Sequence, residues 1–252
     1  MLKLTMVYRG KTNSVQIDAG QAVEFITVEN RKEVNSFEEH SRTSFVTAIL
    51  QHAMENELKV FYIGANRYIL SRLSKLGNSA EFHRVVFLWN EDFSVESYLN
   101  FLMRLDRMLN PNVKTLVILD DYIDYFRDIY KRISQVSSSI YRDGVFWSYP
   151  YVKAIESCIN GLLRLSASKD TGFALLRHAG HGEAINVEHK PNLMEQVLYE
   201  LLPTRYVVRY NKYGVTIHKL PKPSEVIPEL KWFKNLGEYP LNPPKTPPDA
   251  PS

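Results

Sequence analysis

An apolar segment that ends in two aspartates holds the residues best suited to chemistry. Residues 113–119 are apolar apart from Lys114 and Thr115, and Asp120 and Asp121 follow directly. A run of this kind predicts a strand buried on both faces, as in a parallel sheet, where ligands bind at the carboxyl ends of the strands. A buried strand that ends in aspartate can hold the magnesium ion of a nucleotide-hydrolysing site. The alternative is that Asp121 only caps the following helix.

A second group of candidate ligands lies in a glycine-rich stretch, residues 178–191. Its histidines and glutamates are His178, His181, Glu183, Glu188 and His189. Imidazole and carboxylate groups bind zinc, but His-x-x-His spacing is loose and the neighbouring glycines fix no geometry. We therefore expect no metal, and a loop that faces solvent or DNA. The single cysteine, Cys158, excludes an internal disulfide, and its place on a helical apolar pattern predicts a buried, unreactive thiol.

Basic residues alternate with apolar ones in the segment 205–210. If this segment is a strand, Arg205 and Arg209 fall on one face and the tyrosines on the other. Lys212 continues the same basic surface. The pattern predicts contacts with nucleic-acid phosphates or, as the alternative, solubility and protection of an edge strand.

Strands that alternate with helices must position these residues. Apolar runs predict strands at residues 23–28, 60–63, 85–89, 113–119 and 173–176. Helical apolar spacing predicts helices at residues 41–55, 68–76, 95–109, 123–133 and 152–165. Residues 41–44, three hydroxyl side chains around Arg42, are expected to cap the first helix, and Ser94 to cap the third.

This alternation predicts an α/β fold with a mostly parallel sheet and helices on both faces. The third helix is expected to bury one apolar stripe, formed by Val95, Leu99, Leu102, Leu105 and Leu109. Antiparallel hairpins are expected at residues 2–18 and 206–219. We divide the chain into an N-terminal hairpin (1–22), a core domain (23–220) and an irregular proline-rich tail (221–252).

Composition bounds the class of protein. A chain of 252 residues can bury a sizeable core, and its net charge of +3 is too small to indicate nucleic acid by itself. No apolar run reaches the ~18 residues needed to span a bilayer. The first 20 residues lack the apolar core of a signal peptide. We therefore expect a cytoplasmic protein with no membrane segment.

The order of these parts resembles the RecA-fold core of RadA-type recombinases. Residues 85–130 carry the resemblance, because a strand that ends in Asp120 runs into a helix with the family's Phe-Arg-x-x-Tyr motif, here Phe126, Arg127 and Tyr130. The resemblance extends loosely from Val23 to about residue 220. It implies a RecA-like three-layer fold and work on DNA. The family's helix-hairpin-helix domain and Phe-x-x-Ala polymerisation motif have no counterpart ahead of this core.

The phosphate-binding motif departs from the family. A P-loop reads G-x-x-x-x-G-K-[ST], and its backbone N–H groups and lysine hold the phosphates. The corresponding residues 36–43 replace both glycines by serine and the lysine by Arg42, followed by Thr43. Glu38 and Glu39 would repel phosphate. We interpret Arg42, Thr43 and Asp120 as the remnant of a nucleotide site. The alternative for the first two is an ordinary helix cap.

Two further positions depart from the family. The glutamate that prepares the attacking water falls on or near Asn66, and an amide cannot accept a proton as a carboxylate does. The family's glutamine at the end of the fifth strand is replaced near Arg177 and His178. Hydrolysis needs a phosphate site, a metal and a group that positions water together. We therefore predict that the chain is not an ATPase and uses no cofactor.

The resemblance places two DNA-binding loops at residues 137–151 and 178–191. The first contains aromatic residues that can stack on unpaired bases and an arginine for the phosphates: Tyr141, Arg142, Phe146, Trp147, Tyr149 and Tyr151. In the second we assign Arg177, His178 and His181 to the same surface. The alternative is that the aromatic residues form a protein interface or fold onto the core.

These observations predict a non-catalytic RadA-like paralog that binds nucleic acid, single-stranded DNA in the first place, or a partner recombinase. It would assist homologous recombination or DNA repair. One alternative is a divergent ATPase that completes its site with a neighbouring subunit. Another is an inactive RecA-fold scaffold in a different assembly. A RadA-type recombinase or other RecA-fold subunit is the expected protein partner, and homo-oligomers fit the resemblance as well.

Overall fold

A computed structural model describes most of residues 2–220. The described residues are 2–8, 11–28, 34–75, 83–140, 148–178, 198, 200–202, 204–211 and 214–220. Met1–Leu220 form one compact unit and Pro221–Ser252 a second, which lies outside the described residues. No helix among the described residues is long and apolar enough to cross a membrane.

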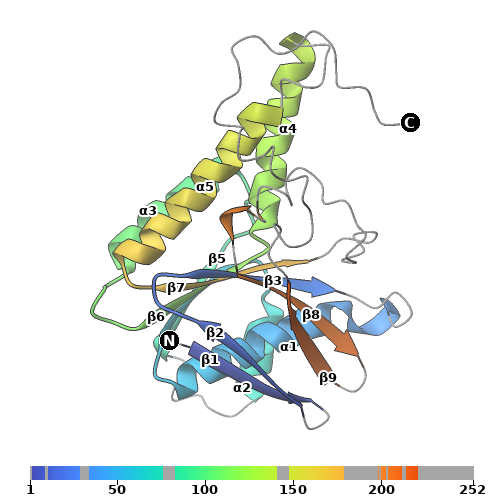
Figure 1. The fold of residues 1–252 in the computed structure, drawn as a ribbon, viewed down its shortest axis with the longest axis vertical. Coiled ribbons are helices and arrows are strands. Elements are labelled where there is room, and N and C mark those ends of the chain that lie inside the picture. Colours follow the sequence, from blue (N-terminus) through green and yellow to red (C-terminus); the bar gives the residue numbers. More distant parts are fainter. Residues whose placement is uncertain are drawn as a thin grey trace. The chain divides into compact units, whose positions relative to one another are not determined.

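A seven-stranded sheet forms the centre of the first unit, in the order β5-β4-β6-β7-β3-β8-β9 (Figure 1). Neighbouring strands are parallel except β8 and β9, which form the predicted antiparallel hairpin. The strands are β3 (Ala22–Val28), β4 (Lys59–Gly64), β5 (Val85–Trp89), β6 (Thr115–Asp120), β7 (Gly172–His178), β8 (Arg205–Asn211) and β9 (Gly214–Lys219). The expected mostly parallel α/β sheet is therefore confirmed.

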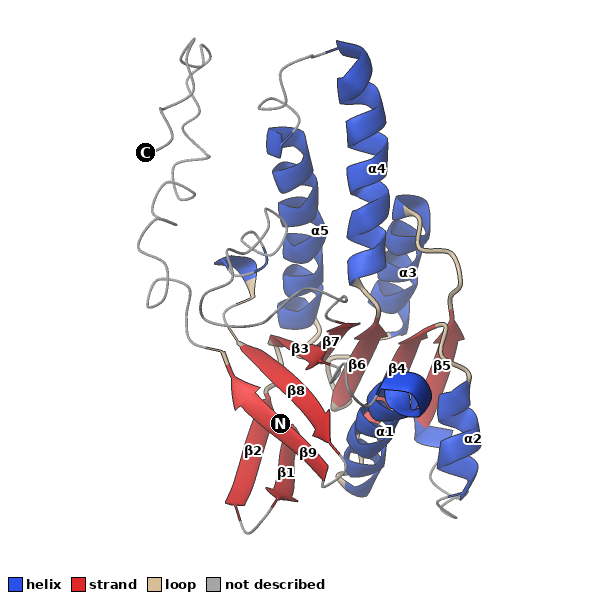
Figure 2. Cartoon of the chain, turned by 90° about the vertical axis from the view of Figure 1, so that its right-hand side faces the viewer, coloured by secondary structure: helices blue, strands red, loops and turns tan. Residues whose placement is uncertain are grey.

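Helices cover both faces of this sheet (Figure 2). On one face lie α1 (Val34–Glu55) and α2 (Tyr68–Lys75). On the other lie α3 (Val95–Met108), α4 (Ile123–Ile140) and α5 (Ser148–Ser168). The arrangement is the three-layer fold that the alternation of strands and helices predicted.

Strand β6 shows why the sheet is buried on both sides. All six of its residues are buried, as the apolar run predicted. Side chains alternate along a strand, so Leu116 and Ile118 enter the hydrophobic core on the α1 side, while Val117 and Leu119 point to the other face. Asp120 ends the strand and shares the α1 side with Ile118.

The predicted N-terminal hairpin consists of β1 (Leu2–Tyr8) and β2 (Lys11–Ile17), which pair antiparallel as a separate two-stranded sheet. Its second strand adds Val15 and Ile17 to the hydrophobic core on the α1 side of the large sheet. The hairpin therefore covers part of that core.

Three helix predictions are wrong in their detail. Helix α1 begins at Val34, ahead of the cap expected at residues 41–44, because residues 34–40 continue the helix. Helix α4 extends to Ile140 and α5 begins at Ser148, so both helices include ends of the expected aromatic loop, whose residues 141–147 lie outside the described residues.

The buried stripe of α3 also differs from the prediction. Its buried residues are Tyr98, Phe101 and Leu105, whereas Leu99 is 51% exposed. The aromatic rings take the inner face because they pack on Tyr125 of α4, with ring centroids 5.3 Å and 5.7 Å apart. The leucine pattern alone therefore placed the helix in a rotated orientation.

Candidate nucleotide and DNA site

Asp120 ends β6 at the carboxyl edge of the sheet, where the sequence placed it. Its side chain is only 1% exposed. The hydroxyl of Tyr62, on the neighbouring strand β4, donates a hydrogen bond of 2.6 Å to Asp120 Oδ2. One carboxylate oxygen is thus engaged by an internal donor, and the group faces the packed interior rather than solvent.

Gly64 allows this close packing. A Cβ atom at this position would lie 2.8 Å from Asp120 Cβ and 2.8 Å from the Tyr62 hydroxyl oxygen. Both distances are shorter than real Cβ contacts, so any side chain would push Asp120 and Tyr62 apart. Glycine at the end of β4 is therefore required by the approach of these two residues.

Asn66, at the position of the family's water-positioning glutamate, has a local structural role. Its Oδ1 accepts a hydrogen bond of 3.2 Å from the backbone N–H of Tyr68, the first residue of α2. The amide therefore satisfies a helix-terminal donor that has no partner within the helix. This contact stabilises the turn between β4 and α2.

A buried charge cluster lies on the opposite face of the sheet and was not predicted. Glu24 of β3 accepts hydrogen bonds from three side chains, of which Arg177 Nε is 2.9 Å away. The others are the Tyr122 hydroxyl and Arg205 Nε. All four residues are buried. They join β3, β7 and β8 to the start of α4, directly after Asp120.

Electrostatics keep Glu24 ionised. Burial raises the pKa of its carboxyl group, but the guanidinium groups of Arg205 and Arg177, with the hydrogen bonds from Arg205 and Tyr122, outweigh burial and lower it to about 2. Burial and the neighbouring Glu24 charge raise the pKa of the Tyr122 hydroxyl well above its usual range. The hydroxyl therefore remains a hydrogen-bond donor to the carboxylate.

The placement of Arg177 and Arg205 corrects two predictions. Both were expected to contact nucleic acid, yet both are buried and bind Glu24. A guanidinium group that is removed from water needs a counter-charge, and Glu24 supplies it. Strand β8 is also not an edge strand, because it lies between β3 and β9.

His178 ends β7 at the same edge of the sheet as Asp120. It is half-buried, and its Nδ1 lies 3.3 Å from the Thr27 hydroxyl on β3. That hydroxyl also donates to the backbone carbonyl of Arg177, at 3.2 Å. By strand alternation His178, Thr27 and Asp120 all face the α1 side. The structure thus brings the ends of β3, β6 and β7 together beside the start of α1.

The expected phosphate-binding segment, residues 36–43, belongs to α1. Arg42 and Thr43 therefore occupy the helix interior, more than a turn past Val34, rather than its first turn. Their side chains lie outside the described part. Only residues 29–33 separate β3 from α1.

Several predicted DNA contacts lie outside the described residues. These are Arg142, Phe146, Trp147, His181 and Lys212, together with the side chains of Tyr149 and Arg209. Tyr149 itself falls within α5 and not in a loop. Among the described residues no group of three or more histidine, cysteine or acidic side chains could hold a metal ion. Cys158 is partly buried, which raises the pKa of its thiol to about 11.

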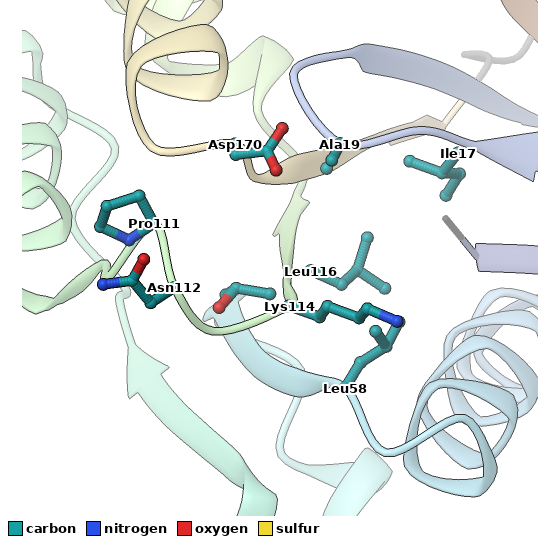
Figure 3. Close-up of a pocket in the computed structure, with 10 residues that line it drawn as sticks. Ile17, Ala19, Leu58, Pro111, Asn112, Lys114, Leu116 and Asp170 are labelled. Carbon is teal, nitrogen blue, oxygen red and sulfur yellow. The ribbon is translucent and has the colours of Figure 1, made fainter.

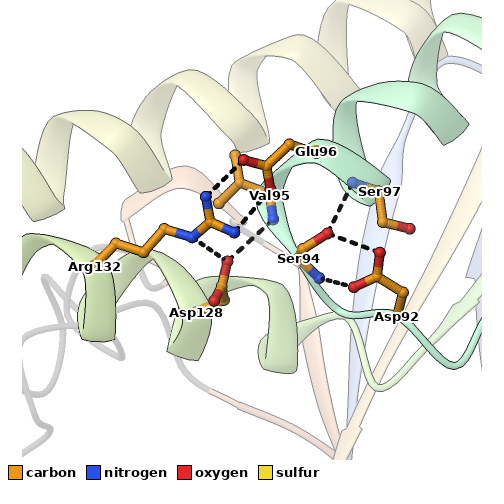
Figure 4. Close-up of polar contacts among 7 residues, drawn as sticks. All are labelled: Asp92, Ser94, Val95, Glu96, Ser97, Asp128 and Arg132. Carbon is orange, nitrogen blue, oxygen red and sulfur yellow. Dashed lines mark hydrogen bonds and ion pairs between the residues drawn. The ribbon is translucent and has the colours of Figure 1, made fainter.

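Helix α3 is fixed to α4 at its start (Figure 4). The Ser94 hydroxyl caps the helix by accepting from Ser97 N at 3.2 Å, and Asp128 of α4 accepts from Val95 N at 3.2 Å. Arg132 binds both oxygens of Glu96, at 2.6 Å and 2.8 Å. Ser94 is the cap that the sequence predicted, whereas the two contributions from α4 were not visible in it.

The outer side of α3 exposes two apolar side chains among polar and charged ones. Leu99 is 51% exposed and Met103 is 57% exposed, one helical turn apart. Strand β5 is an edge of the sheet, since it pairs only with β4 among the described strands. Exposed apolar side chains and an open strand edge are each suited to contact with another protein.

The sequence pattern missed Glu24, Tyr62 and Tyr122. One signal was available, because Glu24 is a lone charge within the apolar strand 22–28 and a buried carboxylate requires a cationic partner. The partners themselves come from distant strands, and no local pattern names them. From the sequence, Tyr62 and Tyr122 are expected to be ordinary core residues, and only the structure shows the contacts of their hydroxyl groups.

Comparison with known proteins was informative at the level of fold. No protein-family model matches the chain, and no curated protein matches its sequence. Among solved structures it is similar to a RadB recombinase, with a TM-score of 0.50 and 12% sequence identity. The match covers 81% of this chain and 83% of that chain. It shows that the fold is RecA-like, as the sequence resemblance predicted.

Proposed function

We propose that this chain is a RecA-fold subunit that assists homologous recombination or DNA repair and does not hydrolyse ATP itself. The observation that carries the proposal is the combination of a RecA-like fold with a helix α1 that already includes residues 36–43. The solved neighbour is a recombinase, which favours recombination as the process.

Helical geometry is the physical argument against phosphate binding. A P-loop works because several successive backbone N–H groups are free to point at the phosphates. In an α-helix only the first four N–H groups are free, since later ones bond to the carbonyl four residues before. In a helix that begins at Val34, the N–H groups of residues 38–43 are committed to helical bonds.

The two catalytic positions support the same proposal. Asp120 is buried and receives a hydrogen bond from Tyr62, so its carboxylate is not presented to a magnesium ion in this conformation. Asn66 carries an amide where hydrolysis needs a base. Phosphoryl transfer depends on all of these parts acting together. We therefore expect no turnover even where nucleotide is abundant.

A second RecA-fold subunit is the partner that the surface favours. Leu99 and Met103 are exposed apolar side chains on α3, and β5 offers an open strand edge among the described strands. DNA would be reached through the two segments that the resemblance assigns to DNA, residues 137–151 and 178–191, because the buried arginines 177 and 205 cannot supply phosphate contacts.

Three titrations test the proposal. Calorimetry with Mg·ATP is expected to give no heat of binding, while a RadA-type recombinase in the same buffer serves as the positive control. Fluorescence anisotropy with single-stranded DNA, at several salt concentrations, measures DNA binding of the chain alone and with the recombinase. The expected result is salt-sensitive DNA binding at least when the recombinase is present.

Two outcomes would overturn the proposal. Binding and hydrolysis of ATP would favour the divergent ATPase, with Asp120 restored to its metal-binding role. Absence of binding to both DNA and recombinase, with another soluble protein captured instead, would favour a scaffold role for the fold.

A further inference from the structure

A cavity lies at the edge of the sheet opposite to Asp120 and His178. It has a volume of about 180 Å³ (Figure 3). Thr115 and Gly172 line it, and these are the first residues of β6 and β7. At about 3.3 Å per residue, the length of β6 separates the cavity from Asp120 by roughly 17 Å. It is therefore a separate site from the candidate nucleotide edge.

The floor of the cavity is apolar and belongs to the protein core. Ile17, Leu58 and Leu116 line it, and each is buried within the core cluster on the α1 side. The three come from the hairpin, from the residue ahead of β4 and from β6. A ligand that enters would place its hydrocarbon part against this floor.

The rim carries two opposite charges. Lys114 precedes β6, and Asp170 lies in the turn between α5 and β7, so the two come from different loops (Figure 3). Both are exposed. Within the described ranges neither side chain forms an ion pair or hydrogen bond, with each other or with another residue. Both charges are therefore available to a ligand.

Backbone hydrogen bonds hold the walls in place. Gly20 N donates to Thr171 O at 3.2 Å, and Phe173 N donates to Gln21 O at 2.8 Å, which joins the β2–β3 turn to the start of β7. Gly172 fits tightly, since a Cβ there would lie 3.1 Å from Ile17 Cγ2. A preformed cavity costs little ordering when it binds.

We infer that this cavity binds a small amino acid, with the ligand carboxylate at Lys114, its ammonium group at Asp170 and its apolar carbons on the floor of Ile17, Leu58 and Leu116. The size agrees, because a protein cavity of roughly 150 Å³ holds benzene. The chemistry agrees as well, since two charges of opposite sign, without ion pairs in the described part of the chain, border an apolar floor. A ligand with only one charge would satisfy only one side of the rim.

Saturation-transfer NMR and calorimetry on the full chain test this inference. The probes are L-leucine, in which the charges share one carbon, and 6-aminohexanoate, in which they are far apart. The single-charge analogues are 3-methylbutylamine and 4-methylpentanoate for leucine, and hexylamine and hexanoate for 6-aminohexanoate. At least one amino acid should bind at least about tenfold more tightly than its own analogues, because each charge-assisted hydrogen bond contributes that much.

Three variants locate the binding. Lys114→Gln and Asp170→Asn should each weaken the amino acid by about tenfold, as each removes one charged partner. Ala19→Leu, at an exposed wall residue, should fill the cavity and abolish binding. Arg104→Gln, exposed on α3, is the matched surface control and should bind as the wild type does. Thermal melting confirms that each variant is folded.

The inference is wrong if neither amino acid binds at 10 mM, or if the single-charge analogues bind equally well. It is also wrong if the Ala19→Leu variant, folded by its melting curve, retains full affinity.

Discussion

Glu24 faces two guanidinium groups in the protein interior, and the stability of the sheet depends on this arrangement. Arg177 and Arg205 stay charged under all ordinary conditions, so their burial is tolerable only beside an ionised carboxylate. The hydroxyl of Tyr122 completes the shell of donors around it. The cluster joins three strands and one helix through a single side chain.

Replacement of Glu24 by glutamine should therefore destabilise the protein strongly. The variant leaves two buried cations without a counter-charge, for which a loss of about 3–5 kcal/mol is expected. Urea unfolding at pH 7 measures the free energy of unfolding. Glu96→Gln is the matched control, because Glu96 is exposed in its ion pair with Arg132 and its loss should leave the melting temperature almost unchanged. Equal stability of both variants would contradict this account.

The same carboxylate predicts the response to acid. Its pKa of about 2 in the folded protein lies below the ordinary value of 4.5, so the folded state binds the proton more weakly than the unfolded chain. Ionised Glu24 therefore adds about 3 kcal/mol to the free energy of unfolding. This stabilisation is fully present above pH 4.5 and is lost as the pH falls towards 2. In unfolding titrations, the difference between wild type and Glu24→Gln should shrink across this range. A constant difference would show that Glu24 does not titrate with a lowered pKa.

Gly64 gives a prediction that separates packing from chain flexibility. Gly64→Ala forces Asp120 and Tyr62 apart, and overpacking of this kind costs about 1–3 kcal/mol. Gly161→Ala is the control, since the new Cβ would lie an ordinary 3.7 Å from Leu102 of α3. Gly161 lies within α5, where alanine is more favourable than glycine by about 1 kcal/mol. The melting temperature should fall for Gly64→Ala and rise for Gly161→Ala. A stabilised Gly64→Ala would contradict the close approach of Asp120 to β4.

Single residues were predictable from the sequence only where the local pattern defines the environment. Asp120 follows five buried positions, residues 115–119, and its place at the strand end could be inferred directly. Arg177 and Arg205 read as surface cations because their partner is remote, on β3. The sequence near these two arginines does not identify that partner.

At the scale of elements, α3 presents the surface that the proposed partner would bind. Leu99 and Met103 lie on its outer side, while Tyr98 and Phe101 hold its inner side against α4. Leu99→Ser with Met103→Ser should abolish association with a RadA-type recombinase in analytical ultracentrifugation. The melting temperature should stay unchanged, because exposed side chains contribute little to folding.

Leu105→Ala is the contrasting variant on the same helix. Leu105 is buried, so its truncation should cost about 2–5 kcal/mol without removing the exposed patch. Below its lowered melting temperature this variant should still associate with the recombinase. If only the Leu105 variant lost association, the recombinase would not bind at Leu99 and Met103.

Elements were predictable in type and order, but less so at their ends. The five apolar runs all became strands, and β6 shows the burial on both faces that such a continuous run predicts. Helix ends depended on contacts that the pattern does not contain. The start of α3 is fixed partly by Asp128 and Arg132 from α4, and α1 continues through residues whose serines read as caps.

At the scale of the whole molecule, the fold and the nucleotide site are separable. The strand order is RecA-like, although the identity to the solved neighbour is only 12%. Sheet order depends on which strands can be buried, whereas phosphate binding depends on a few residues with special backbone conformations. A chain can therefore keep its sheet order after it has lost the ability to bind phosphate.

This separation predicts that restoring the motif alone will not restore the site. The triple variant Ser36→Gly, Ser41→Gly and Arg42→Lys recreates the P-loop residues within α1. Two glycines in a helix cost about 1 kcal/mol each, so the melting temperature should fall. Mg·ATP at 5 mM should not raise it again, because a ligand stabilises only the protein that binds it. The control is the triple variant Ser36→Ala, Ser41→Ala and Arg42→Lys. It keeps the helix, so its melting temperature should not fall in this way. A rise with Mg·ATP in the glycine variant alone would mean that residues 36–43 can leave the helix and fold around phosphate.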